Sequence, residues 1–168
     1  MKYIEDKVEN LLKEFSIHSA PIDPIKCAKN LGVVVQSVDL DSDVSGLFVT
    51  KDNVSYIMYN RSEQKVRQRF TIAHELGHFV LHKDVSLFID KTQRVLYRDS
   101  SSTTGEKLKE REANAFAAAL LMPRTLIDME VLNIPNDKDI VEFLSKKFNV
   151  SELAMSFRLS NLGYEIGW

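Results

Sequence analysis

Two histidines separated by three residues are the part of this sequence best suited to chemistry. His74 and His78 stand in the run HELGH. On an α-helix, with roughly 100° per residue, side chains four positions apart lie about 40° apart in angle and one turn apart along the axis. Both imidazoles can therefore reach one metal ion. Glu75 shares the same broad face, where its carboxylate can accept a proton from the attacking water of a hydrolytic reaction.

A glycine inside this run suggests tight packing around the motif. Gly77 lies between Glu75 and His78, and a glycine costs about 1 kcal/mol of helix stability relative to alanine. We therefore expect another element to approach the helix closely at Gly77.

A catalytic zinc site usually has three protein ligands and one open position, so a third ligand must come from outside HELGH. Cys27 is the only cysteine, and in PIKCAKNLG it reads as a buried apolar position. His82 would lie about 80° around the helix from His74 and two turns away, too far to share one ion. We expect His82 to end the helix or to make a structural hydrogen bond.

Glutamates in the downstream segment EKLKEREANAFAAALLMP are better candidates for the third ligand. Glu112 shares a helical face with Phe116 and Ala119, which favours an inward orientation. Glu110 points about 160° away and has charged neighbours. We therefore expect Glu112 to be the metal ligand and Glu110 to be solvated.

The surrounding elements are mainly helical. Apolar spacing and capping signals predict helices at residues 4–15, 24–31, 61–82 and 106–122. Two more are expected between 136 and 163, joined by FNVS, with Ser151 as a cap and Gly163 as a stop. Asn60 and Glu63 read as the cap of the third helix. Strands are expected at 32–38, 46–50 and 54–59, the last two as a hairpin. VSLFID and QRVLY are weaker strand candidates, and DSSSTTG reads as a mobile loop.

Composition excludes several other classes of protein. Of the 168 residues, 44% are hydrophobic and 27% charged, which is typical of a globular protein. The formal net charge of -2 gives no overall attraction to nucleic acid. The first residues lack the apolar run of a secretory signal, and no apolar stretch is long enough to span a bilayer. We expect a cytoplasmic protein that has no membrane association.

Together the segments RFTIAHELGHFVLH, EANAFAAALLMP, DPIKCAKNLGVVV and FNVSELAMSFRLSNLG resemble the ImmA/IrrE family of metallopeptidases. The resemblance extends over most of residues 21–163. It implies a gluzincin-like site with His74, His78 and Glu112 as ligands of one Zn²⁺ or Mn²⁺ per chain, and Glu75 as the catalytic carboxylate. It also implies an endopeptidase that cleaves a helix-turn-helix repressor of a mobile element or stress response.

We accordingly expect an α+β fold with a mostly helical zincin-like core and a small antiparallel sheet. Residues 1–135 would form the metallopeptidase domain, and residues 136–168 a helix-turn-helix-like subdomain docked on it.

DNA binding by that subdomain, or metal-dependent regulation without cleavage, are the alternative functions. Direct nucleic-acid binding is disfavoured because residues 136–163 hold four basic and four acidic side chains. Their apolar residues read more simply as contacts with the catalytic body, and they include Ile140, Phe143, Leu144, Phe148, Leu153, Phe157 and Leu162.

Overall fold

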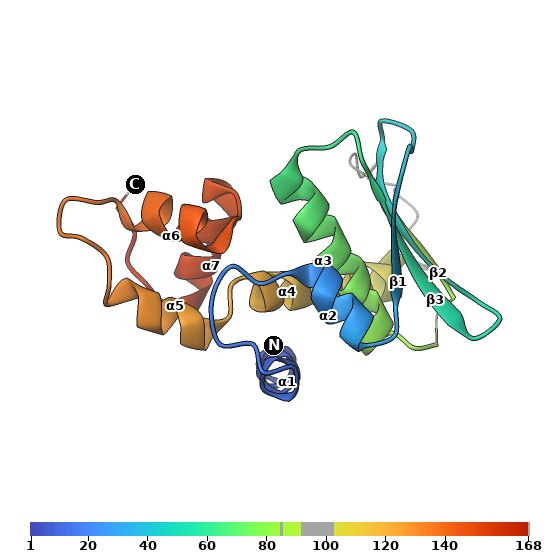
Figure 1. The fold of residues 1–168 in the computed structure, drawn as a ribbon, viewed down its shortest axis with the longest axis horizontal. Coiled ribbons are helices and arrows are strands. Elements are labelled where there is room, and N and C mark those ends of the chain that lie inside the picture. Colours follow the sequence, from blue (N-terminus) through green and yellow to red (C-terminus); the bar gives the residue numbers. More distant parts are fainter. Residues whose placement is uncertain (85, 92–102, 168) are drawn as a thin grey trace.

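The computed structural model describes residues 1–84, 86–91 and 103–167. Within these ranges the chain forms seven helices and one four-stranded sheet, which confirms the α+β class (Figure 1). The elements are α1 (Lys2–Glu14), α2 (Pro24–Asn30), β1 (Val34–Val38), β2 (Val44–Lys51), β3 (Val54–Asn60), α3 (Lys65–Leu81), β4 (Leu87–Lys91), α4 (Thr103–Leu121), α5 (Arg124–Val131), α6 (Ile140–Phe148) and α7 (Glu152–Leu162). No helix in these ranges is long and apolar enough to cross a membrane.

The sheet is mixed and not purely antiparallel. Its strand order is β1-β3-β2-β4. The expected hairpin of β2 and β3 is present, with Phe48 opposite Ile57, and β4 is antiparallel to β2. β1 is parallel to β3, with Val35 opposite Ile57. β2 occupies one edge of β3, so β1 pairs with the other edge. The alternation of side chains in β1 does not show whether that pairing is parallel or antiparallel.

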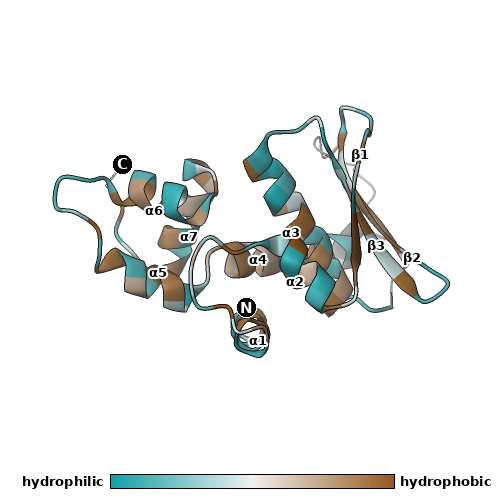
Figure 2. Ribbon diagram, viewed as in Figure 1, coloured by the Kyte–Doolittle hydropathy of each residue, from teal (hydrophilic) through white to brown (hydrophobic). Residues whose placement is uncertain are grey.

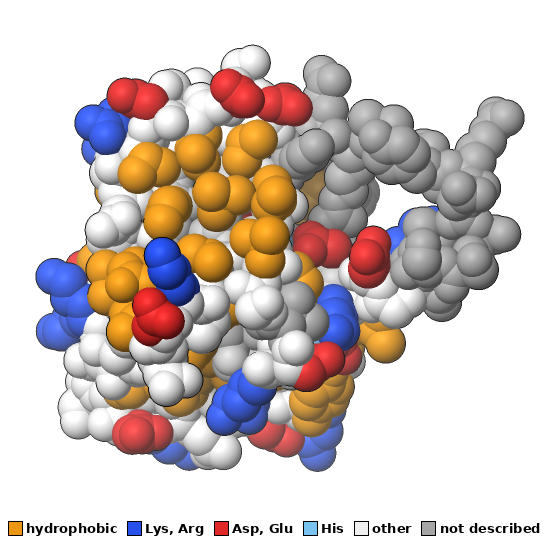
Figure 3. All heavy atoms as spheres, turned by 90° about the vertical axis from the view of Figure 1, so that its right-hand side faces the viewer, with side chains coloured by type: hydrophobic (Ala, Val, Ile, Leu, Met, Phe, Trp, Pro, Cys, Tyr) orange, Lys and Arg blue, Asp and Glu red, His pale blue; other side chains and the backbone are white. Residues whose placement is uncertain are grey.

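The two faces of the sheet differ in their surroundings. Phe48 and Ile57 point into the core, and α3 packs on that side. The opposite face carries exposed apolar side chains, among them Val34, Leu87 and Ile89. Figure 3 shows hydrophobic side chains gathered on this outer side of the sheet.

The centre of the molecule is the contact between α3 and α4. A Cβ added to Gly77 would lie 3.1 Å from the Cα of Ala113 and 3.1 Å from the Cβ of Phe116. The close approach expected at Gly77 is therefore confirmed, and α4 is the element that makes it. α3 is hydrophilic at its start and more hydrophobic where it meets α4 and the sheet (Figure 2). α1 covers another side of α4.

Several predicted helix ends are confirmed. Ser151 accepts a hydrogen bond at the start of α7, and Gly163 ends that helix with φ +89°. Asp23, for which no cap was predicted, accepts hydrogen bonds at the start of α2. The expected cap of α3 is wrong, because that helix begins after Gln64 without a side-chain cap. Asn60 instead donates to the carbonyl oxygens of Leu40, Asp41 and Val44 and so fixes the loop before β2. QRVLY and most of DSSSTTG lie outside the described residues.

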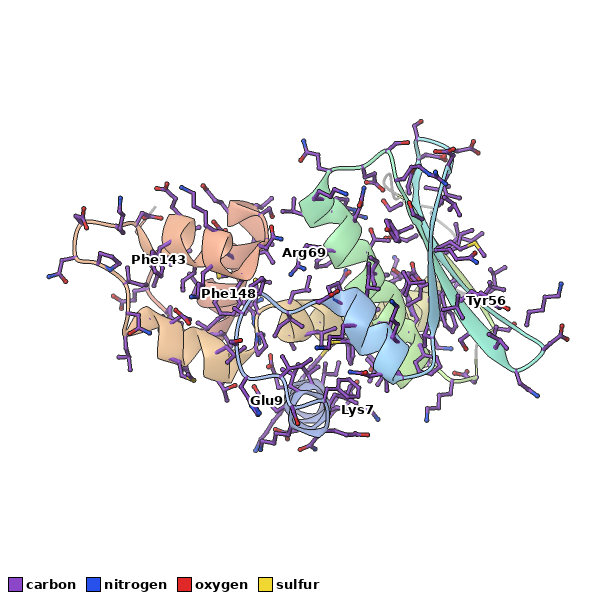
Figure 4. All side chains as sticks on the ribbon, viewed as in Figure 1. Lys7, Glu9, Tyr56, Arg69, Phe143 and Phe148 are labelled. Carbon is purple, nitrogen blue, oxygen red and sulfur yellow. The ribbon has the colours of Figure 1, made fainter. Side chains whose placement is uncertain are left out.

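Polar links join the last three helices to the rest of the chain. Arg69 on α3 donates to the carbonyl oxygens of Phe148 and Asn149 at the end of α6, and Figure 4 shows its side chain between these helices. Arg158 on α7 is 5% exposed and forms a bidentate pair with Glu5 on α1. The helices α5, α6 and α7 lie together at one end of the molecule (Figure 1).

The expectation for the tail is wrong at two positions. Leu144 and Phe148 are buried as expected, whereas Leu153 is 66% and Phe157 58% exposed. The rest of the protein therefore covers only part of the apolar surface of α7.

Candidate metal centre

The two motif histidines lie on one face of α3 with their side chains buried. His74 is 2% and His78 0% exposed. Their Nε2 atoms are 3.2 Å apart. The four-residue spacing therefore brings the two nitrogen atoms together as the helical geometry requires.

Glu110 supplies a third donor to this pair. One carboxylate oxygen lies 3.2 Å from His74 Nε2 and the other 3.0 Å from His78 Nε2. Metal–ligand distances of about 2.0–2.1 Å in a tetrahedral zinc site place donor atoms about 3.3 Å from one another. The three donors thus have nearly the separations that one such ion requires. The side chains of His74, His78 and Glu110 fit a divalent metal ion.

Glu112, the ligand expected from the sequence, lies elsewhere. One oxygen of its carboxylate is 2.7 Å from His82 Nε2, and the other accepts a hydrogen bond from the Tyr3 hydroxyl on α1. Among the described residues it does not join His74 and His78 in a candidate ligand group. The structure therefore places Glu110 where Glu112 was expected.

The error arose from treating α4 as a helix with one buried face. Ala113, Ala117 and Leu120 are buried, as are Phe116 and Ala119 on another side. Because α3 and α1 both pack on α4, an inward orientation was possible for both glutamates. The helical spacing correctly places Glu110 and Glu112 on different sides of α4. It does not show which of those sides faces the motif histidines of α3.

Hydrogen bonds outside the donor set fix the two imidazoles. His74 Nδ1 lies 2.8 Å from the Oδ1 atom of Asn114, an acceptor, so Nδ1 carries the proton. His82 Nε2 donates to the Glu112 carboxylate, which leaves Nδ1 of a neutral His82 as an acceptor for His78 Nδ1, 2.9 Å away. Both motif histidines then present the lone pair of Nε2 toward Glu110, as metal ligation would require. The two roles expected of His82 as alternatives are both present, since it ends the helix and donates a hydrogen bond to Glu112.

The pKa shift of His78 favours the same protonation state. Burial lowers the pKa of His78, which keeps its imidazole neutral. Burial alone would raise the pKa of Glu110, but the hydrogen bonds and charge of His74 and His78 outweigh that effect and lower it. Those hydrogen bonds need a proton on Nε2, whose place a bound metal ion would take. Neutral imidazoles beside an ionised carboxylate are the states in which these side chains bind a metal.

Glu75 is buried beside the donor set without a partner of its own. It is 0% exposed, and within the described residues neither carboxylate oxygen has a hydrogen-bond partner. Burial raises its pKa well above the ordinary value, and the nearby carboxylates of Asp90 and Glu110 raise it further. Burying a carboxylate without a hydrogen-bond partner costs free energy. We therefore expect Glu75 to interact with a water molecule or a substrate group.

The sequence analysis missed three residues near the centre. Asp90 on β4 lies within 4.8 Å of donor atoms of His74 and Glu75, and it pairs with Arg67 at 3.3 Å. Asn114 holds His74. A Cβ at Gly46 would meet the Thr71 Cγ2 atom at 2.4 Å, so a glycine is required where β2 crosses α3. A glycine in a strand can indicate such an approach, but only the structure shows which helix is approached.

Comparisons with known proteins agree with this site. The IrrE N-terminal-like domain family, Peptidase_M78, matches residues 28–160, a range that contains every candidate ligand. The chain therefore belongs to this family of metallopeptidases, as the sequence resemblance implied.

The similar proteins include IrrE and ImmA metallopeptidases. The radiation response metalloprotease IrrE of Deinococcus deserti is 33% identical over 105 residues, which are 62% of this chain and 35% of that protein. Metallopeptidase ImmA of Bacillus subtilis is 26% identical over 166 residues, covering 96% of this chain and 87% of ImmA. This chain thus spans about a third of the length of IrrE and most of the length of ImmA.

A solved structure supports the fold. A Mycobacterium tuberculosis transcriptional regulator superimposes with a TM-score of 0.70 over 95% of this chain and 47% of that chain, at 18% sequence identity.

Proposed function

We propose that this protein is a zinc-dependent endopeptidase that hydrolyses a peptide bond in a protein substrate. The observation that supports it most strongly is the convergence of His74, His78 and Glu110 beside the buried Glu75, which has no hydrogen-bond partner in the described part of the chain. Two imidazoles and one carboxylate are the ligand set of catalytic zinc sites that keep a fourth position open. Mn²⁺ is the second metal that this donor set could accept.

Each residue has a defined role in this proposal. His74, His78 and Glu110 would hold the ion, while Asn114 and His82 orient the two imidazoles. When bound, the metal would polarise the scissile carbonyl and lower the pKa of the attacking water to about 7. Glu75 would accept the proton of that water and deliver it to the leaving amine.

The family resemblance makes a helix-turn-helix repressor the proposed substrate, and a repressor encoded beside this gene is the first candidate to test. The cytoplasmic location and the boundary between residues 135 and 136 remain predictions.

Incubation of the metal-loaded protein with the neighbouring repressor, followed by mass analysis of the fragments, tests the proposal. We expect defined fragments with Zn²⁺ or Mn²⁺ and none after chelation. A protein that binds one metal per chain but cleaves neither this repressor nor unfolded proteins would be a metal-dependent regulator instead.

A further inference from the structure

The strongest feature outside the donor set is a groove between the catalytic body and α7. It has a volume of about 950 Å³, at the upper end of the range for ligand sites. α3 contributes Val66 and Phe70 to its lining, and α4 contributes Ala115 and Ala118. The exposed Leu153 and Phe157 of α7 also line it.

The groove adjoins the candidate metal centre. Asn114 and Asp90 both line it; the former contacts His74 at 2.8 Å, and the latter lies near the donor atoms of Glu75 and His74. Phe70 stacks on the His74 ring, with centroids 6.4 Å apart. A chain bound in the groove would therefore reach the site of hydrolysis.

The exposed side of α7 is suited to protein and not to nucleic acid. Leu153, Phe157 and Asn161 recur every four residues and all line the groove, so they form one stripe along the helix. The only basic residue of α7 is Arg158, which is buried and paired with Glu5. A helix that reads DNA needs exposed cationic side chains for the phosphates, and this face has none.

The charges of the groove add one requirement for the occupant. Arg67 is paired with Asp90, and Arg158 with Glu5. Arg111 on α4 is exposed, and no described carboxylate lies within ion-pair distance of it. It offers an unneutralised guanidinium to whatever lies in the groove.

Building on the proposed function, we infer that this groove binds the substrate segment on one side of the scissile bond. The segment carries apolar side chains that contact Leu153 and Phe157 and a carboxylate that pairs with Arg111. α7 thus acts as part of a substrate-recognition surface for a protein, although the helix-turn-helix arrangement to which it belongs resembles a DNA-binding module.

The test uses the full-length, metal-loaded protein and long synthetic peptides of mixed sequence, with retained peptides and cleaved peptides identified separately by mass spectrometry. We expect apolar and acidic residues to be enriched in both sets. A Leu153→Ser, Phe157→Ser variant should lose the apolar enrichment and about tenfold in kcat/KM, mainly through KM. Arg111→Glu should replace the acidic preference by a basic one.

Leu132→Ser provides the matched control, because Leu132, the residue directly after α5, is 86% exposed and does not line the groove. It should leave both sets of peptides unchanged, and metal content should be equal in all variants.

The outcomes separate the inference from the proposed function. Retention that depends on Leu153 and Phe157 without any cleavage would support the groove and refute the endopeptidase. Cleavage with the same residue preferences in the double variant would refute the groove and leave the endopeptidase intact. If the protein neither retains nor cleaves any peptide, both the groove and the endopeptidase are refuted. Two other results would also overturn the inference. One is salt-sensitive binding of mixed-sequence duplex DNA, and the other is a dimer in sedimentation, if the Leu153→Ser, Phe157→Ser variant abolishes it.

Discussion

Glu110 and Glu112 lie two residues apart on α4 and contact different histidines, two of them on α3 and one directly after it. Glu110 reaches the Nε2 atoms of His74 and His78, whereas Glu112 reaches His82. One glutamate therefore completes the donor set, and the other orients it through His82. Two similar substitutions should have effects of different size.

Glu110→Gln should lower metal affinity by more than about 100-fold, because it removes a donor, and Glu112→Gln by about tenfold, because it weakens only the support of His78. Metal titration monitored by competition with a chelating dye measures both. If Glu112→Gln abolishes binding while Glu110→Gln retains it, the assignment of the ligand on α4 is wrong.

The sequence predicted the parts of this protein that depend on local spacing. HELGH on a helix, the amphipathic α1, the β2–β3 hairpin and the cap at Ser151 all follow from periodicity and from capping chemistry. The sequence could not predict relations between distant segments. Glu110 meets His78 only because α4 crosses α3 at Gly77, and β1 joins β3 in parallel only because β2 occupies the other edge.

The prediction that Leu153 and Phe157 contact the catalytic body failed for a related reason. Periodicity shows that an apolar face exists, but it does not show how much of that face the rest of the chain covers.

Gly46→Ala should destabilise the protein by about 1–3 kcal/mol, because its Cβ would overlap Thr71 where β2 crosses α3. Adding Thr71→Ser, which removes the overlapping methyl group, should restore part of the loss. Urea unfolding measures the free energy of unfolding of wild type, Gly46→Ala and the Gly46→Ala, Thr71→Ser double variant. Gly105→Ala is the control: nothing would contact its Cβ, so stability should stay the same or rise by up to about 1 kcal/mol, because Gly105 lies in the first turn of α4. A Gly46→Ala variant as stable as wild type would show that the approach of β2 to α3 is not tight.

The Glu5–Arg158 pair should make stability depend on acid pH. Burial opposes ionisation of Glu5, but the hydrogen bond and charge of Arg158 outweigh it and lower the pKa below the ordinary 4.5. The pair therefore stabilises the fold fully above about pH 4.5, and this contribution is lost as pH falls through the lowered pKa of the folded state.

Glu5→Gln should reduce stability at neutral pH and flatten its decline in acid. Denaturant unfolding at several pH values measures this, with the exposed Glu14→Gln as control. Parallel curves for wild type and Glu5→Gln between neutral and acid pH would contradict the role of the pair. Arg158→Met should cost about 3 kcal/mol, because it leaves Glu5 without its partner.

Glu75→Gln, measured for metal content and for cleavage in the same preparation, tests the central claim most directly. The substitution preserves the size of the side chain but removes the basic carboxylate, and Glu75 is not needed to complete the His74, His78 and Glu110 donor set. We therefore expect one metal per chain to remain while cleavage of the repressor falls by about 100-fold or more. Glu106→Gln, a change at an exposed position of α4, should leave both measurements unchanged. Undiminished cleavage by metal-loaded Glu75→Gln would contradict the account, as would loss of the metal together with the activity.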